Sequence, residues 1–240
     1  MSEKVALVTG AARRLGEAIA LGLAGKGYQI VVHYHQSQRD AFETMNSIRK
    51  HGRDAITIQA DVSDQEEVSR MFDRTIEHFG RLDVLINNAG VFPRAPLEAI
   101  TETMWEQTIG TNLKGPFFCA QMAAKIMLTQ KSGRIINIAS VGGLIPYKNY
   151  LVYSVSKAGL IMLTKCLAKE CAPDVTVNAI APGSIKFTEG EAESHIPLNR
   201  IPLNRLATPD EVVAAVIFLA TSADYISGQV LCLDGGRTLV

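Results

Sequence analysis

A tyrosine and a lysine four residues apart are the pair in this chain best suited to acid–base chemistry. They are Tyr153 and Lys157, and Ser140 lies thirteen residues before the tyrosine. Residues four apart on a helix share one face, so the phenol and the ammonium can converge. A nearby ammonium favours the phenolate and lowers the pKa of a tyrosine. We therefore predict that Tyr153 exchanges a proton with a carbonyl or alcohol oxygen, and that Ser140 holds that oxygen in place.

This spacing alone has a second interpretation, because such pairs also occur on ordinary surface helices. A second motif favours the catalytic interpretation: T-G-A-A-R-R-L-G at 9–16 closes the first apolar run of the chain. Gly10 follows that run, and Gly16 falls in the first turn of the next helical pattern. Backbone N–H groups there would face the pyrophosphate of a dinucleotide, helped by the helix dipole. A nicotinamide dinucleotide would supply the hydride for carbonyl chemistry.

Polar and small residues also follow two later apolar runs. Asp61 comes directly after 55–60, and Asn88-Ala89-Gly90 comes after 82–87. In a doubly wound sheet, ligands bind beyond the carboxyl ends of the strands. A carboxylate at Asp61 can accept from the adenine amino group, and small residues at 88–90 leave room for ribose and adenine. These positions add to the prediction of a dinucleotide site.

The middle of the glycine turn bears on which dinucleotide binds. Arg14 stands where such turns usually carry glycine, so the chain gives up the freedom to take φ > 0 and gains a phosphate-binding guanidinium. NAD sites place an acidic residue about 20 residues after the turn, whereas this chain has H-Y-H-Q-S at 33–37 and no acid until Asp40. Solvated arginines are the alternative. We expect NADP(H), with a 2′-phosphate pocket formed by Arg13, Arg14, His35 and Ser37.

Short apolar runs alternate with helical patterns along the whole chain. The runs are nearly all apolar, as in parallel strands covered on both faces. We expect an α/β fold: a single doubly wound Rossmann-type domain over 1–240, with a seven-stranded parallel sheet and helices on both faces. The expected strands are 5–9, 28–34, 55–60, 82–87, 134–139, 175–180 and 229–234, and the expected helices lie near 15–26, 38–51, 64–79, 101–130, 150–171 and 208–221.

Two helix starts and one long loop stand out in this framework. Ser63 with Glu66, and Thr208 with Glu211, have capping-box spacing. The segment 183–206 has no clear strand or helix pattern, and it contains I-P-L-N-R twice in tandem. Long loops in compact domains are often functional, so we predict a substrate lid there. A tolerated duplication in a surface loop is the alternative.

The composition argues against several classes of protein. Lys+Arg and Asp+Glu both total 24, so neither nucleic acid nor an anionic membrane is an expected partner. No stretch approaches the ~20 apolar residues of a membrane span, and no signal peptide is expected. The four cysteines have no metal-ligand spacing, so we expect no metal site and interpret them as buried thiols. A cytoplasmic protein is the expectation.

Together these motifs resemble the short-chain dehydrogenase/reductase family over essentially the whole chain. The turn at 9–16, the stretch Asn87-Asn88-Ala89-Gly90, Ser140 and the Tyr153/Lys157 pair carry the resemblance. It implies an NAD(P)-dependent oxidoreductase with a Ser-Tyr-Lys core that acts on a ketone or a secondary alcohol. Further matches lie at Leu15, Asp61-Val62, Asn112, Pro182-Gly183 and Leu233-Asp234-Gly235-Gly236, of which Leu15 and Val62 would contact the cofactor.

The resemblance implies roles that spacing alone leaves open. Lys157 would also bind the nicotinamide ribose, and Asn112 would hold a water in a proton relay to Lys157. The Pro182-Gly183 turn and Ile185 would lie against the nicotinamide. Members of the family are commonly dimers or tetramers through their long helices. A homo-oligomer, either a dimer or a homotetramer, is therefore expected.

The substrate stays open between branches of that family. Ser140 and N-N-A-G resemble 3-oxoacyl-acyl-carrier-protein reductases and general alcohol dehydrogenases. Arg14 with H-Y-H-x-S resembles pteridine reductases, although that branch has an arginine where this chain has Gln36. We rank a small-molecule ketone or secondary alcohol first, with a 3-oxoacyl thioester as a candidate within this class, and a dihydropterin second. A nucleotide-sensing protein that has lost the chemistry is a third alternative.

Overall fold

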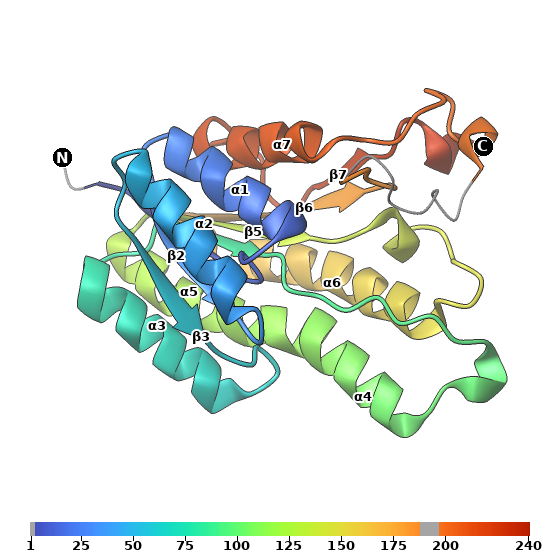
Figure 1. Ribbon diagram of the computed structural model, residues 1–240, viewed down its shortest axis with the longest axis horizontal. Helices are drawn as coiled ribbons and strands as arrows, with labels where there is room; N and C mark the ends of the chain where they lie inside the picture. The colour runs from blue at the N-terminus through green and yellow to red at the C-terminus, as the bar shows by residue number, and fades with distance from the viewer. Residues whose placement is uncertain (1–2, 188–196) are drawn as a thin grey trace.

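A parallel sheet of seven strands runs through the computed structural model, which describes residues 3–187 and 197–240. The strand order is β3-β2-β1-β4-β5-β6-β7 (Figure 1). Every strand expected from the apolar runs is present, which confirms the α/β fold class. The strands are β1 (Val5–Val8), β2 (Gln29–Tyr34), β3 (Ala55–Gln59), β4 (Val84–Asn87), β5 (Gly133–Ile138), β6 (Val175–Pro182) and β7 (Val230–Leu233).

Helices cover both faces of the sheet, as Figure 1 shows. Side chains of β1 alternate between two cores: Ala6 and Val8 face one, and Val5 and Leu7 face the other. This explains why the strands are apolar on both sides. One face is covered by α1 (Arg14–Gly25), α2 (Gln38–Lys50) and α7 (Pro209–Thr221), and the other by α3 (Gln65–Phe79), α5 (Gly115–Gln130) and α6 (Leu151–Glu170).

The helix expected at 101–130 is interrupted by a wider turn. It consists of α4 (Glu102–Ile109), a π-helical turn at Gly110–Lys114, and α5. Gly115 allows a close approach here, because a Cβ at this position would lie 2.9 Å from the Val62 carbonyl oxygen. The turn carries Asn112, and π-helical turns are frequent at functional sites.

One of the two expected helix caps is confirmed and the other is wrong. Thr208 and Glu211 form the capping box at the start of α7. At α3 the cap is Asp64, whose Oδ1 accepts from the N–H groups of Glu66 (2.8 Å) and Glu67 (3.0 Å). Ser63 lies one residue before this cap, and its hydroxyl donates to Asp61 Oδ1.

Two of the four cysteines contradict the expectation of buried thiols. Cys119 and Cys171 are buried, but Cys166 and Cys232 are exposed. Cys232 lies on β7, which is an edge strand with solvent on part of its surface. The pattern of the sequence does not reveal which strand ends the sheet.

The expectation that no segment approaches a membrane span also needs a correction. Among the described helices, α6 is long and apolar enough to cross a membrane, by length and composition only. Its apolar residues Leu167 and Ala168 belong to the core on one face of the sheet. The hydropathy of α6 thus has an explanation in packing.

Candidate active site

The predicted site residues gather at the carboxyl ends of the strands. The chain order reverses between β1 and β4, which is where ligands bind in doubly wound sheets. The glycine turn follows β1, and Asn88-Ala89-Gly90 follows β4. Ser140 lies just after β5, and Pro182 ends β6. These segments therefore lie together at the carboxyl ends of the strands.

The glycine turn is held closely against the segment after β4. Gly10 has a φ of +64°, and a Cβ at Gly16 would lie only 2.0 Å from the Gly10 carbonyl oxygen. The side-chain amide of Asn88 donates to the carbonyl oxygens of Thr9 (2.9 Å) and Gly10 (3.2 Å). Asn88 thus holds the turn in place, whereas the sequence analysis expected only that residues 88–90 leave room for ribose and adenine. The first N–H groups of α1 lack partners within the helix, so this cradle fits a pyrophosphate.

His33 is a buried residue of this site that the sequence analysis missed. Its Nδ1 accepts from the Gly10 N–H (3.0 Å), and its Nε2 lies 2.9 Å from the Ala60 carbonyl oxygen. The ring must be neutral, with the proton on Nε2, because Nδ1 is an acceptor. Burial lowers the pKa of His33 to about 4. His33 therefore ties the glycine turn to the end of β3, and a polar residue in an apolar run was the available signal.

Acid should destabilise the fold through His33. An unfolded histidine titrates near 6.5 and the folded His33 near 4, so the unfolded state binds more protons between these values. The free energy of unfolding should fall by at most about 3 kcal/mol as the pH drops from 6.5 to 4. Urea unfolding at pH values between 6.5 and 4 should show that His33→Gln lacks this fall in the free energy of unfolding. The exposed-histidine control His51→Gln should keep it, and the same pH dependence in all three proteins would contradict the assignment.

Arg14 adopts the backbone conformation that the sequence analysis reserved for glycine. Its φ is +55°, so the expectation that arginine gives up this conformation is wrong. A left-handed non-glycine residue costs roughly 1–2 kcal/mol. The guanidinium offsets part of this cost, since its Cζ lies 4.4 Å from the centroid of the Phe187 ring. Arg14 thus links the glycine turn to the segment after β6, while Arg13 is exposed beside it.

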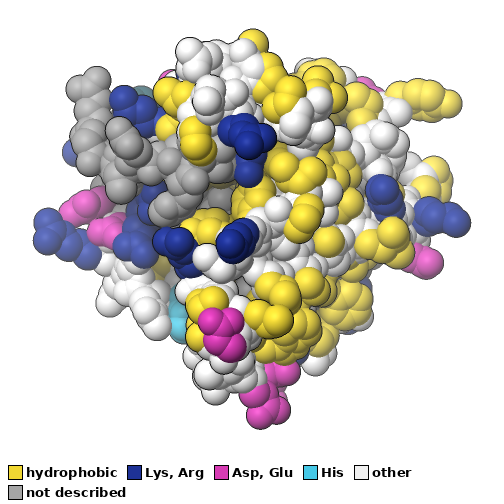
Figure 2. Space-filling model, turned by 90° about the vertical axis from the view of Figure 1, so that its right-hand side faces the viewer, with side chains coloured by type: hydrophobic (Ala, Val, Ile, Leu, Met, Phe, Trp, Pro, Cys, Tyr) yellow, Lys and Arg dark blue, Asp and Glu magenta, His cyan; other side chains and the backbone are white. Residues whose placement is uncertain are grey.

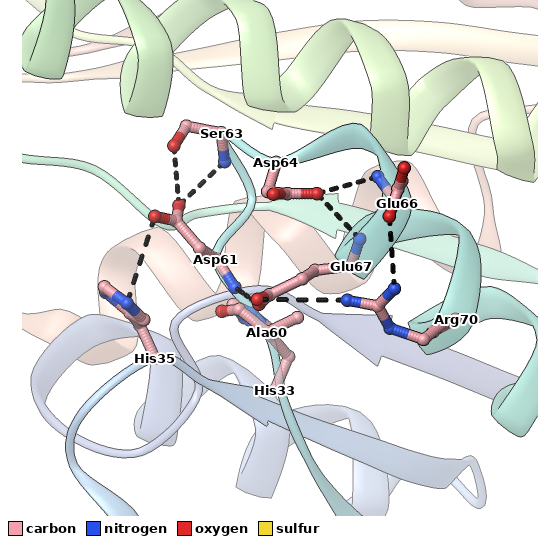
Figure 3. Close-up of polar contacts among 9 residues, drawn as sticks. All are labelled: His33, His35, Ala60, Asp61, Ser63, Asp64, Glu66, Glu67 and Arg70. Atoms are coloured by element: carbon pink, nitrogen blue, oxygen red, sulfur yellow. Dashed lines mark hydrogen bonds and ion pairs between the residues drawn. The ribbon is translucent and has the colours of Figure 1, made fainter.

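His35 and Asp61 meet where β2 and β3 end, as Figure 3 shows. Asp61 Oδ1 accepts from the N–H (2.9 Å) and the hydroxyl (2.8 Å) of Ser63, and Oδ2 lies 3.9 Å from His35 Nε2. Burial alone would raise the pKa of Asp61, but these bonds and the imidazole hold it below its usual value. That Asp61 accepts from the adenine amino group stays a prediction. Ser37 precedes α2 and makes no side-chain cap bond.

Tyr153, Lys157 and Ser140 lie together as the spacing predicts. The Lys157 Nζ is 5.9 Å from the centroid of the Tyr153 ring and donates to the Ile138 carbonyl oxygen (2.8 Å). Ser140 Oγ accepts from the N–H of Gly142 (3.0 Å). The side chain of Lys157 is buried. An acid, a cation and a hydroxyl therefore share the end of β5.

The expected lowering of the Tyr153 pKa is wrong for the protein alone. Burial raises the pKa of Tyr153 to about 12, although a hydrogen bond with Ser140 opposes this. Burial also lowers the pKa of Lys157 to about 8. The ammonium lies over the ring and donates to a backbone carbonyl oxygen. At neutral pH the tyrosine keeps its proton and the lysine keeps its charge, which suits proton donation.

Asn112 lies beside Lys157, but its side chain is used to hold another segment. Its Oδ1 accepts from the Val91 N–H (2.8 Å), and its Nδ2 donates to the Val91 carbonyl oxygen (2.9 Å) and to Ser156 Oγ (3.1 Å). A Cβ at Gly90 would lie 3.2 Å from Asn112 Oδ1 and 3.7 Å from Lys157 Nζ. Asn112 thereby fixes the chain after β4 next to the lysine.

The predicted lid lies partly outside the described residues, which exclude 188–196. Its described ends are attached to the domain. Ile185 pairs with Ala207 in an isolated bridge, and a Cβ at Gly183 would lie 3.1 Å from Asp234 Cα. In the second copy of the I-P-L-N-R repeat, the Leu203 N–H donates to the Gly235 carbonyl oxygen (3.1 Å). The opening and closing of a lid stays a prediction.

Aromatic contacts beside Tyr153 were not evident from the sequence. The Phe92 ring stacks on Tyr150 with centroids 4.2 Å apart and meets the edge of Tyr153 at 4.4 Å. Arg237 Nη1 donates to the Tyr147 hydroxyl (2.7 Å) from near the other end of the chain. No local spacing signals these pairs, since they join residues far apart in sequence.

Comparisons with known proteins agree with this geometry. Residues 4–196 match the family model described as short chain dehydrogenase. The chain is 44% identical to a 3-oxoacyl-[acyl-carrier-protein] reductase of Synechocystis, with 100% of this chain and 98% of that protein covered. It is 43% identical to the 3-oxoacyl-[acyl-carrier-protein] reductase FabG of Staphylococcus aureus, with 97% of each covered.

A solved structure gives the same result. Acetoin dehydrogenase YohF from Salmonella typhimurium superposes with a TM-score of 0.91 at 35% identity, covering 99% of this chain and 97% of that chain. The pteridine-reductase alternative is not favoured by these relatives. The chain therefore belongs to the short-chain dehydrogenase/reductase family, and it is an NAD(P)-dependent oxidoreductase acting on CH–OH and C=O groups.

Proposed function

We propose that this enzyme reduces a ketone with NADPH and that a 3-oxoacyl thioester is its substrate. The observation that carries the proposal is the meeting of Ser140, Tyr153 and Lys157 at one end of the sheet. When bound, NADPH supplies the hydride. Tyr153 gives its proton to the carbonyl oxygen, which Ser140 holds by a hydrogen bond. The Lys157 ammonium stabilises the phenolate that remains.

The residues at the carboxyl ends of the strands have the chemistry that binding of a dinucleotide requires. The close-packed turn and the first amides of α1 would hold the pyrophosphate, and Asp61 would accept from the adenine. Arg13 and Arg14 after β1, and His35 and Ser37 after β2, would bind the 2′-phosphate. The proposed cofactor set is Gly10, Arg13, Arg14, Leu15, Gly16, His35, Ser37, Asp61, Val62, Asn88, Ala89, Gly90, Tyr153, Lys157, Pro182, Gly183 and Ile185, with Asn112 in the catalytic set.

Two observations support a thioester with an acyl chain. The Synechocystis and Staphylococcus aureus relatives are named as 3-oxoacyl-[acyl-carrier-protein] reductases. Figure 2 shows this end of the molecule, where hydrophobic side chains gather among several Lys and Arg side chains. Exposed apolar residues follow the strands that carry the site, which suits an acyl chain: Val91, Phe92, Leu144 and Leu151.

Steady-state oxidation of NADPH tests the substrate class. Acetoacetyl thioesters, carried on coenzyme A and on acyl carrier protein, should be reduced with a higher kcat/KM than small ketones such as diacetyl. The comparison uses the same enzyme preparation and a saturating concentration of NADPH. Reduction of the small ketones alone would overturn the thioester proposal and leave the ketone reductase in place.

The choice of NADPH over NADH should depend on Arg14. Arg14→Met keeps a long side chain at the same left-handed position but removes the charge. Losing a charge-assisted bond to phosphate should lower kcat/KM with NADPH about 10- to 100-fold, and leave kcat/KM with NADH within about threefold. Arg74→Met on the exposed surface of α3 is the matched control. Equal losses with both cofactors would show that Arg14 does not read the 2′-phosphate.

A homo-oligomer, a dimer or a tetramer, is also part of the proposal. The long helices α5 and α6 carry exposed apolar side chains, and covering them is favourable in water. Mass photometry over a range of concentrations measures the assembly directly. The exposed residues concerned are Phe117, Leu128, Val155 and Met162.

A further inference from the structure

His33 lies at the carboxyl end of β2, where its side chain is closed to solvent. Two successive N–H groups of the glycine turn are bonded to this one residue. The Gly10 N–H donates to His33 Nδ1 (3.0 Å), and the Ala11 N–H donates to the His33 carbonyl oxygen (2.8 Å). Both amides at the start of the turn are therefore used within the protein, so a pyrophosphate would be bound by the N–H groups that open α1.

The other ring nitrogen of His33 holds the segment that carries Asp61. His33 Nε2 donates to the Ala60 carbonyl oxygen (2.9 Å), because Nδ1 is the acceptor and a neutral imidazole has one proton. The Ala60 N–H donates in turn to the Tyr34 carbonyl oxygen (3.0 Å). Figure 3 shows His33 beside Ala60, which directly precedes Asp61. His33 thus joins the pyrophosphate end of the proposed dinucleotide site to its adenine end.

The bond to His33 fixes a peptide that has few other restraints. Gly10 has no side chain, and glycine has more backbone freedom than any other residue. Its carbonyl oxygen accepts from the Asn88 amide (3.2 Å) and its N–H donates to His33, so both of its polar groups are held. Burial lowers the pKa of His33 to about 4, which keeps Nδ1 an acceptor at neutral pH. Without that acceptor the Gly10 N–H is unpaired, and the turn is expected to move to find another partner.

We propose that His33 is a positioning residue for the dinucleotide: its Nδ1 sets the direction of the Gly10 peptide and so places the N–H groups that open α1 against the pyrophosphate. His33 acts on binding of the cofactor and not on the chemical step, because it lies under the turn and away from Tyr153. NADPH and NADH share the pyrophosphate, so His33 affects both equally, in contrast to Arg14. This role rests on the proposed function, since it assumes that the glycine turn binds a dinucleotide.

Three substitutions separate the two bonds that the His33 ring makes. His33→Asn keeps an acceptor for Gly10, because Oδ1 of asparagine is as many bonds from Cβ as Nδ1 of histidine. His33→Gln keeps only a donor for Ala60, since its amide nitrogen corresponds to Nε2, and His33→Leu keeps neither. In fluorescence titrations, the Kd for NADPH should stay within about threefold of wild type in His33→Asn. It should rise about tenfold in His33→Gln and His33→Leu, and the Kd for NADH should rise by the same factor.

Asn178→Leu is the matched control for the loss of a buried polar residue from a strand. The Asn178 side chain also bonds two main-chain groups, since Nδ2 donates to the Ile226 carbonyl oxygen (2.7 Å) and Oδ1 accepts from the Gln229 N–H (3.0 Å). This variant should lower Tm and leave both cofactor Kd values unchanged. At saturating NADPH, kcat for acetoacetyl thioester reduction should stay within about twofold of wild type in every His33 variant.

The comparison of His33→Asn with His33→Gln decides the proposal, and it does not need His33→Leu to fold. An equal rise in Kd in these two variants would overturn the positioning role, because loss of packing would explain it. An unchanged Kd in His33→Gln, or a rise for NADPH alone, would overturn it too. If the wild-type protein binds neither NADPH nor NADH, it is the proposed function that fails.

Discussion

Tyr153→Phe is expected to lower kcat for ketone reduction by at least about 1,000-fold. The substitution removes the one proton that the site can give to a carbonyl oxygen, and general acid catalysis is worth roughly 10²- to 10⁴-fold. Burial raises the pKa of Tyr153 to about 12, so the wild-type phenol is protonated throughout the neutral range. The aromatic contact with Phe92, at a centroid distance of 4.4 Å, does not need the hydroxyl. The fold should therefore survive.

Binding of NADPH separates loss of chemistry from loss of structure. Its Kd, measured by fluorescence titration, should stay within about threefold of wild type in Tyr153→Phe. Tyr225→Phe, which removes the hydroxyl of a fully exposed tyrosine, is the control. A Tyr153→Phe enzyme that keeps a tenth or more of wild-type kcat would show that another group supplies the proton.

Lys157→Met should lower kcat by roughly 100- to 1,000-fold and also weaken NADPH binding. It removes the buried charge that stabilises the phenolate, and it leaves the Ile138 carbonyl oxygen without the bond it now accepts at 2.8 Å. Burial lowers the pKa of Lys157 to about 8. In wild type, kcat/KM for reduction should therefore be level below pH 8 and fall above it, as the ammonium loses its proton.

The pH profile identifies this lysine as the titrating group. The fall above pH 8 should be absent from the residual activity of Lys157→Met. Lys165→Met, at an exposed position on the same helix, should keep both the wild-type rate and the profile. A fall near pH 8 that persists in Lys157→Met would assign it to another residue.

The strands and the meeting of Ser140, Tyr153 and Lys157 could be predicted because their signals are local. A short apolar run indicates a strand of the sheet, and a helix puts Tyr153 and Lys157 on one face at their spacing. The rule that ligands bind at the carboxyl ends of parallel strands then places Ser140 and Asp61 at the same edge. Each of these steps needs only neighbouring residues and a general rule about sheets.

The remaining features depend on contacts between distant residues. His33 bonds to Gly10 and lies against the Ala60 carbonyl oxygen, and Arg237 donates to Tyr147, which is 90 positions away. The pKa of Tyr153 depends on how deeply it is buried, and spacing does not report burial. The left-handed conformation of Arg14 depends on the close packing of the turn around it.

Transfer of deuterium from NADPH labelled at C4 to the product measures the proposed reaction itself. Acetoacetyl thioester reduced by the wild-type enzyme, with each of the two labelled epimers of NADPH in turn, should yield one deuterium on the carbon that bears the new hydroxyl with one epimer. Mass spectrometry of the 3-hydroxyacyl product detects it, and the Tyr153→Phe enzyme should form none of this product. Product without deuterium from either epimer, or no reduction of any ketone, would contradict hydride transfer to a carbonyl at this site.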